Sequence, residues 1–122
     1  MTSLELATEA VKILDDKKAM NLKVIGIKDI SVLADYFVLA TGTSNTHVKS
    51  LADEVEFKMK QFDIRLLHTE GYRSNSWVLL DFGCVIIHVF TAESRQFYDL
   101  DRLWQDGQIV EIAGIESLNT DS

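Results

Sequence analysis

The residues whose types and spacing most suggest a chemical function are Gly42-Thr43-Ser44, which separate an apolar run from an amphipathic segment. A glycine-serine turn between a strand and a helix is typical of phosphate-binding sites, because the first amide groups of a helix attract anions. The P-loop pattern GxxxxGK(S/T) is absent, and the turn contains no lysine or arginine. Nucleotidyl transfer would also need paired carboxylates on a neighbouring strand, whereas Asp53 and Glu54 lie in the amphipathic segment. A small nucleotidyl- or phosphoryl-transfer enzyme that uses Gly42-Thr43-Ser44 is therefore the alternative hypothesis.

The spacing of the histidines and the cysteine does not indicate a catalytic or metal-binding site. His47, His68 and His88 show neither HxH nor HxxxH spacing, whereas a zinc site needs three or four converging ligands. Cys84 has no neighbour that would favour a thiolate. Asp81-Phe82-Gly83 spells the metal-binding triplet of protein kinases, but the chain is far too short and lacks the other kinase motifs. We therefore predict a protein that is not an enzyme and needs no cofactor or metal.

The segment from Glu93 to Trp104, ESRQFYDLDRLW, offers binding chemistry instead. Tryptophan, tyrosine and arginine are the residue types that dominate the energetics of protein interfaces. The alternative interpretation is a terminal helix that packs its apolar residues against a sheet. These residues are Phe97, Leu100, Leu103 and Trp104.

Composition limits the class of protein. The chain has 122 residues, which corresponds to one domain, and its hydrophobic fraction of 47% is enough for a core. A net charge of −7 argues against a nucleic-acid backbone binder and permits a basic protein partner. The sequence has no apolar run of bilayer length and no leader-like N-terminal segment, and its single cysteine excludes an intramolecular disulfide. We therefore expect a cytoplasmic protein with no membrane contact.

The turn at residues 42–44 must be positioned by the strand and the helix that flank it. Residues 36–39 are aromatic or aliphatic, as in a buried strand. Gly42 is expected to supply backbone freedom for the chain reversal, and Ser44 or Asn45 to cap the helix that follows. Apolar residues then recur at steps of three and four from Val48 to Phe62, which predicts a helix of about four turns.

The remaining elements follow from similar local patterns. Thr2 and Glu5 have the spacing of a capping box at the start of a helix over 2–15. Together these elements predict a mixed α/β fold in the order α-β-β-α-β-β-β-α, with a five-stranded sheet. We expect one domain over residues 1–104 and a loosely held tail over residues 105–122. The other predicted elements are strands at 22–27, 64–68, 77–81 and 85–90 and a short helix at 92–98.

The hairpin formed by the last two predicted strands has one apolar side and one mixed side. A two-residue turn at Phe82-Gly83 would align the mixed sides and place Trp77 opposite His88. A longer turn with a bulge at Gly83 would exchange the two sides. We favour the two-residue turn. The resulting mixed face could bind a partner, or another helix could cover it.

Several long motifs resemble the ribosomal silencing factor family, also called Iojap or RsfS. They are ADYFVLATGTSNTHVKSLADEV at 34–55, EG at 70–71, WVLLDFGCVIIHVF at 77–90 and ESRQFYDLDRLW at 93–104. The likeness covers about residues 3 to 104, and the tail from Gln105 lies outside it. Cys84 stands where an acidic residue is expected for the family, which would weaken one polar contact at the hairpin.

The resemblance implies a translation repressor. Members of the family bind the L-fourteen protein on the intersubunit face of the large ribosomal subunit, block joining of the small subunit and lower translation when nutrients are short. The resemblance also implies a nucleotidyltransferase-like fold without the catalytic carboxylates. We expect no sequence-specific contact with nucleic acid. The oligomeric state is open, and a homodimer of the free protein is one alternative.

The predicted partner-binding surface combines the mixed face of the hairpin with the terminal segment. Trp77 and Tyr98 are expected to be the apolar anchors, because aromatic side chains dominate binding hot spots. Acidic side chains around them would meet arginine or lysine of a ribosomal protein, whereas Phe97 and Leu103 are expected to lie in the core. The predicted partner-binding residues are Glu70, Trp77, His88, Arg95, Tyr98, Asp99 and Asp101.

Overall fold

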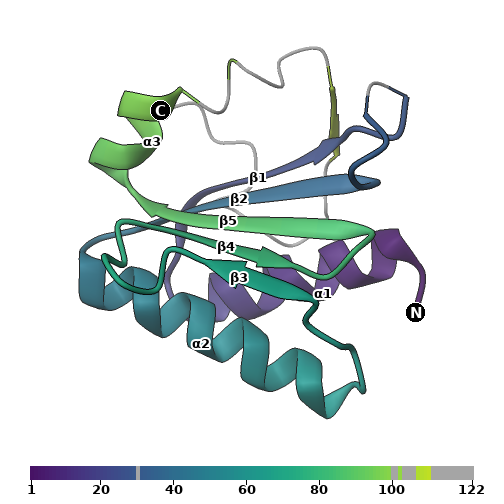
Figure 1. Cartoon of the computed structure of the whole chain (residues 1–122), viewed down its shortest axis with the longest axis horizontal. Helices are drawn as coiled ribbons and strands as arrows, with labels where there is room; N and C mark the ends of the chain where they lie inside the picture. The colour runs from purple at the N-terminus through teal and green to yellow at the C-terminus, as the bar shows by residue number, and fades with distance from the viewer. Residues whose placement is uncertain (30, 100–101, 103–106, 111–122) are drawn as a thin grey trace.

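A six-stranded mixed sheet carries two long helices on one face and a short helix on the other (Figure 1). This computed structural model describes residues 1–29, 31–99, 102 and 107–110. The strand order across the sheet is β3-β4-β5-β2-β1-β6. The elements are α1 (Ser3–Asp16), β1 (Met20–Gly26), β2 (Tyr36–Gly42), α2 (Asn45–Gln61), β3 (His68–Glu70), β4 (Trp77–Asp81), β5 (Val85–Thr91), α3 (Ala92–Tyr98) and β6 (Gln108–Val110).

The main core lies between the sheet and the helices α1 and α2, which both run below the strands in Figure 1. The predicted capping box begins α1: the Thr2 hydroxyl accepts from the Glu5 amide at 3.1 Å, and the Glu5 carboxylate accepts from the Thr2 amide at 2.8 Å. The apolar stripe of α2 is buried from Val48 to Met59. The hydrogen bonds of the capping box and the burial of the apolar stripe therefore stabilise the two helices, as the sequence pattern predicted. Within the described residues, no helix has the length and apolar composition that a membrane crossing requires.

Two strands differ from the prediction. The sheet has six strands, and the expectation of five is wrong because β6 pairs with β1 across a long stretch of chain. The third strand is β3, not residues 64–68. The Ile64 amide instead closes the end of α2 by donating to the Met59 carbonyl at 3.0 Å, and pairing with β4 begins at Leu67. Residues 105–106 and 111–122 of the predicted tail lie outside the described residues, and the domain boundary at 104 stays a prediction.

The turn of the β4–β5 hairpin lies at Gly83-Cys84, one residue later than predicted. The Phe82 amide donates to the Val85 carbonyl at 3.0 Å, and Gly83 has φ +91°, a value that favours glycine. The Asp81 carboxylate accepts from the Gly83 amide at 2.7 Å. The turn still contains two residues, so the prediction that the two mixed sides share a face is confirmed.

The later turn shifts the pairing by two residues. Trp77 lies opposite Phe90, and His88 lies opposite Leu79. The prediction that Trp77 lies directly opposite His88 is therefore wrong, although the two residues remain diagonal neighbours on one face. Beside them, the face opposite α1 and α2 holds a second buried cluster. Its members are Ile25, Ile27, Ala34, Phe37, Leu39, Ile86 and Phe90.

Candidate functional site

Trp77 and His88 form a hydrogen-bonded pair on the mixed face. The Trp77 indole Nε1 donates to His88 Nδ1 at 3.1 Å. The imidazole and the Phe37 ring make an edge-type contact with their centroids 4.9 Å apart. Trp77 is half-buried, so part of its indole remains accessible.

His88 lies beneath the surface and is only 4% exposed. Burial lowers the pKa of His88 to about 4, because an imidazolium loses its hydration there. The expectation that the mixed face shows His88 to a partner is therefore wrong. The alternation of the strand assigned His88 to the correct face, but only the packing of Trp77 and Phe37 over it decides its exposure.

Three aromatic rings extend from the sheet onto α3, and we call Trp77, Phe97 and Tyr98 the aromatic platform. The Trp77 and Tyr98 rings have centroids 4.6 Å apart, and the Phe97 and Tyr98 rings meet edge to face at 5.0 Å. Phe97 is 81% exposed and Tyr98 52% exposed. The prediction that Phe97 lies in the core is wrong, because α3 has only seven residues and buries none of them. Its exposure could not be read from spacing.

Arg95 attaches α3 to the sheet. Its Nη1 donates to the Asn21 carbonyl at 2.6 Å and to the Thr41 hydroxyl at 3.0 Å. Its guanidinium carbon lies 5.3 Å from the centroid of the Phe90 ring, within cation–π range. Arg95 therefore holds the helix that carries the platform. A direct contact of Arg95 with a partner stays a prediction.

Acidic side chains border the platform. Glu70 is exposed and lies opposite Leu79, on the same face as Trp77. Asp99 ends α3 in the left-handed conformation, with φ 51°, and its carboxylate lies 4.0 Å from the Arg102 guanidinium. The predicted contact residue Asp101 lies outside the described residues, as do Leu100, Leu103 and Trp104.

The turn at residues 42–44 is held by its own hydrogen bonds. The Thr43 amide donates to His47 Nδ1 at 2.9 Å, so the other ring nitrogen donates to the Lys17 carbonyl at 2.8 Å. Ser44 caps α2 by accepting from the His47 amide at 3.1 Å. Gly42 is needed for close approach and not for backbone freedom, because a Cβ there would lie 2.9 Å from the Val48 side chain. These contacts favour a structural turn.

Ser44→Ala should lower the free energy of unfolding by about 1 kcal/mol, the usual effect of removing an N-cap. Partner affinity should stay close to wild type, because α2, which Ser44 caps, lies on the opposite face of the sheet from the platform (Figure 1). Denaturant unfolding measures the change in stability, and a binding titration measures the change in partner affinity. A binding defect without a stability change would restore the phosphate-site hypothesis.

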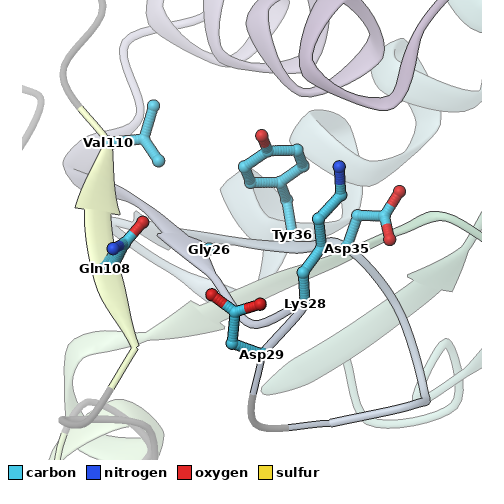
Figure 2. Close-up of a pocket in the computed structure, with 7 residues that line it drawn as sticks. All are labelled: Gly26, Lys28, Asp29, Asp35, Tyr36, Gln108 and Val110. Carbon is cyan, nitrogen blue, oxygen red and sulfur yellow. The ribbon is translucent and has the colours of Figure 1, made fainter.

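A small pocket of about 210 Å³ opens at the start of β2, at the opposite end of that strand from the turn. Figure 2 shows Lys28 and Asp35 beside the Tyr36 ring, with Gln108 and Val110 of β6 forming the other wall. The lining mixes one amine with carboxylates, so no single charge dominates it. Among the described residues, no group of three or more histidine, cysteine, aspartate or glutamate side chains is arranged to hold a metal ion.

Comparison with known proteins adds independent evidence. A family model described as "Ribosomal silencing factor during starvation" matches residues 1–122. The protein "Ribosomal silencing factor RsfS" of Halalkalibacterium halodurans is 38% identical over 117 residues, which cover 96% of this chain and 100% of the relative. The mouse protein "Mitochondrial assembly of ribosomal large subunit protein 1" is 30% identical over 84% of this chain and 48% of its own length. A crystal structure from Chromobacterium violaceum superimposes with a TM-score of 0.84 at 33% identity, covering 95% of this chain and 97% of that one.

Proposed function

Because the chain belongs to the family of ribosomal silencing factors, RsfS, we propose that it represses translation by binding the large ribosomal subunit. The bound protein sterically blocks joining of the small subunit and lowers translation under nutrient limitation. This function places it in the cytoplasm. One relative carries the large ribosomal subunit in its name, which supports that subunit as the partner.

The observation that carries the proposal is the exposed aromatic platform. Phe97 and Tyr98 project from a short helix, beside a tryptophan fixed on the sheet. Exposed aromatic side chains held in one place are the usual anchors of a protein interface, because they bury a large area at a small entropic cost. The platform is therefore the surface that we assign to the ribosome.

The partner we propose is the L-fourteen protein of the large subunit. Ribosomal proteins present arginine and lysine, and the chain offers a net charge of −7 with Glu70 and Asp99 bordering the platform. Complementary charge of this kind raises the association rate and disfavours wrong partners.

The proposed mechanism is occupancy without a covalent step. The turn that resembles a phosphate site uses the Thr43 amide and the Ser44 hydroxyl for internal hydrogen bonds. Repression by occupancy should therefore be stoichiometric. An enzyme that modified the ribosome would instead act below one equivalent, and its effect would persist after removal.

Titration of the protein into purified subunits tests this mechanism. Joining should fall linearly and reach its minimum near one protein per large subunit, as measured on sucrose gradients. A high-salt wash of the treated large subunits should restore joining, and protein stripped with EDTA before the assay should act like untreated protein. Inhibition well below one equivalent, or inhibition that survives the wash, would contradict occupancy. A nucleotide that raises the melting temperature would favour the transfer-enzyme alternative.

A further inference from the structure

The His88 side chain has one satisfied nitrogen and one unsatisfied nitrogen. Because Nδ1 accepts from the Trp77 indole at 3.1 Å, it carries no proton. The proton of the neutral ring therefore lies on Nε2. Nε2 is buried and finds no hydrogen-bond partner among the described residues. In the described part of the chain, this buried donor therefore has no acceptor, and it lies in the face that supports the aromatic platform.

A buried unsatisfied N–H lowers the stability of a protein. Its surroundings are apolar: Phe37 meets the imidazole edge to face at 4.9 Å, and Leu39 and Leu79 lie opposite His88 on the neighbouring strands. An aliphatic residue would pack in this position without the orphan donor. The presence of histidine is explained if its other nitrogen performs a function that an aliphatic residue cannot perform.

We propose that His88 is a positioning residue of the partner-binding surface, which fixes the Trp77 indole through the Nε1–H···Nδ1 hydrogen bond. The fixed indole then lies against Tyr98, at a centroid distance of 4.6 Å, in the orientation that a partner meets. Without the bond, a half-buried indole would gain alternative orientations, and binding would have to restore one of them. The inference deepens the proposed function and rests on it.

The low pKa of His88, about 4, supports this role. The ring stays neutral at physiological pH, so Nδ1 remains an acceptor. The contact between the imidazole and the Phe37 ring further restrains the orientation of His88.

Two substitutions of nearly equal size separate positioning from packing. His88→Asn keeps an acceptor close to the place of Nδ1 but buries an amide, whereas His88→Leu removes the acceptor and every buried polar atom. The His88→Leu variant should be more stable than the His88→Asn variant, because leucine leaves no unsatisfied buried donor. Binding should follow the opposite order. A residue that only packs the core would give the same order in both measurements.

The first measurement is the indole N–H signal of Trp77 in the full chain, assigned with a Trp104→Phe variant as the common background. In the wild type and His88→Asn the N–H should exchange slowly with solvent, and in His88→Leu it should exchange at least tenfold faster. The second is the dissociation rate from isolated large subunits, which should rise at least tenfold in His88→Leu and less than threefold in His88→Asn.

Each outcome decides between the hypotheses. If wild type binds but His88→Leu keeps both the slow exchange and the slow dissociation, the positioning role is wrong while the proposed function stands. If His88→Asn binds as weakly as His88→Leu, the acceptor is irrelevant and the role is also wrong. If the wild-type protein does not bind large subunits, the proposed function fails and the inference fails with it.

Discussion

Tyr98→Ala is expected to lower the affinity for isolated large ribosomal subunits at least about thirtyfold. Truncating a hot-spot aromatic typically costs about 2 kcal/mol or more, and 1.4 kcal/mol corresponds to a factor of ten. The melting temperature should change little, because Tyr98 is 52% exposed and α3 buries no residue. Binding titrations with fluorescent protein, beside thermal unfolding, measure the two effects separately.

The matched control is Phe57→Ala. Phe57 is 57% exposed, so it has nearly the same exposure as Tyr98, but it lies on α2 on the opposite face of the sheet. Its removal should leave affinity within twofold of wild type. Phe97→Ala should weaken binding without loss of stability, since Phe97 belongs to the platform. Wild-type affinity for Tyr98→Ala, or equal losses for Tyr98→Ala and Phe57→Ala, would show that the wrong surface has been assigned.

A charge variant at the border of the platform should behave differently. Asp99→Asn keeps a residue that tolerates the left-handed conformation, so only the charge is lost. A border charge mainly changes the association rate and its salt dependence. The defect should therefore be a few-fold at low salt and disappear at high salt, whereas the Tyr98→Ala defect should persist.

Gly71→Ala is expected to destabilise the protein by about 2–5 kcal/mol, the sum of a backbone and a packing penalty. Gly71 has φ +93°, a conformation that costs an L-residue about 1–2 kcal/mol. A Cβ in this position would also overlap the Trp77 carbonyl oxygen and lie 3.1 Å from the Val78 Cα. Because these atoms belong to the backbone, the loop must shift, which adds a penalty of about 1–3 kcal/mol. The melting temperature should fall by roughly 10 °C or more.

Gly26→Ala provides the control for Gly71→Ala. A Cβ at Gly26 would meet the Gln108 carbonyl and the Tyr36 ring at 3.6 Å, which is ordinary van der Waals contact. Alanine also restricts the unfolded chain, so stability should be unchanged or slightly raised. The displaced loop of Gly71→Ala leads into Trp77, so this variant should also bind large subunits weakly at temperatures where it remains folded. Melting curves within 3 °C of each other for the two variants would contradict this account of Gly71.

The sequence determined the features that depend on neighbours along the chain. The capping box of α1, the apolar stripe of α2 and the two-residue length of the hairpin turn, though not its position, were predictable from local spacing. The alternation in β4 and β5 also assigned Trp77 and His88 to one face. The motifs in these same segments identified the family. They also selected Trp77 and Tyr98, which the structure brings to a centroid distance of 4.6 Å.

Tertiary structure alone decided which of these residues a partner can reach. His88 alternates like a surface residue but is buried, because the rings of Trp77 and Phe37 meet on it from neighbouring strands. Phe97 is a residue type usually found in cores, but it is exposed, because Arg95 and not Phe97 makes the contact between α3 and the sheet. The strand β6 pairs with β1 across more than eighty residues, and its three residues carry no strong pattern of their own. Burial and pairing depend on segments that are distant in sequence, so local periodicity can assign a side chain to a face but cannot determine what covers that face.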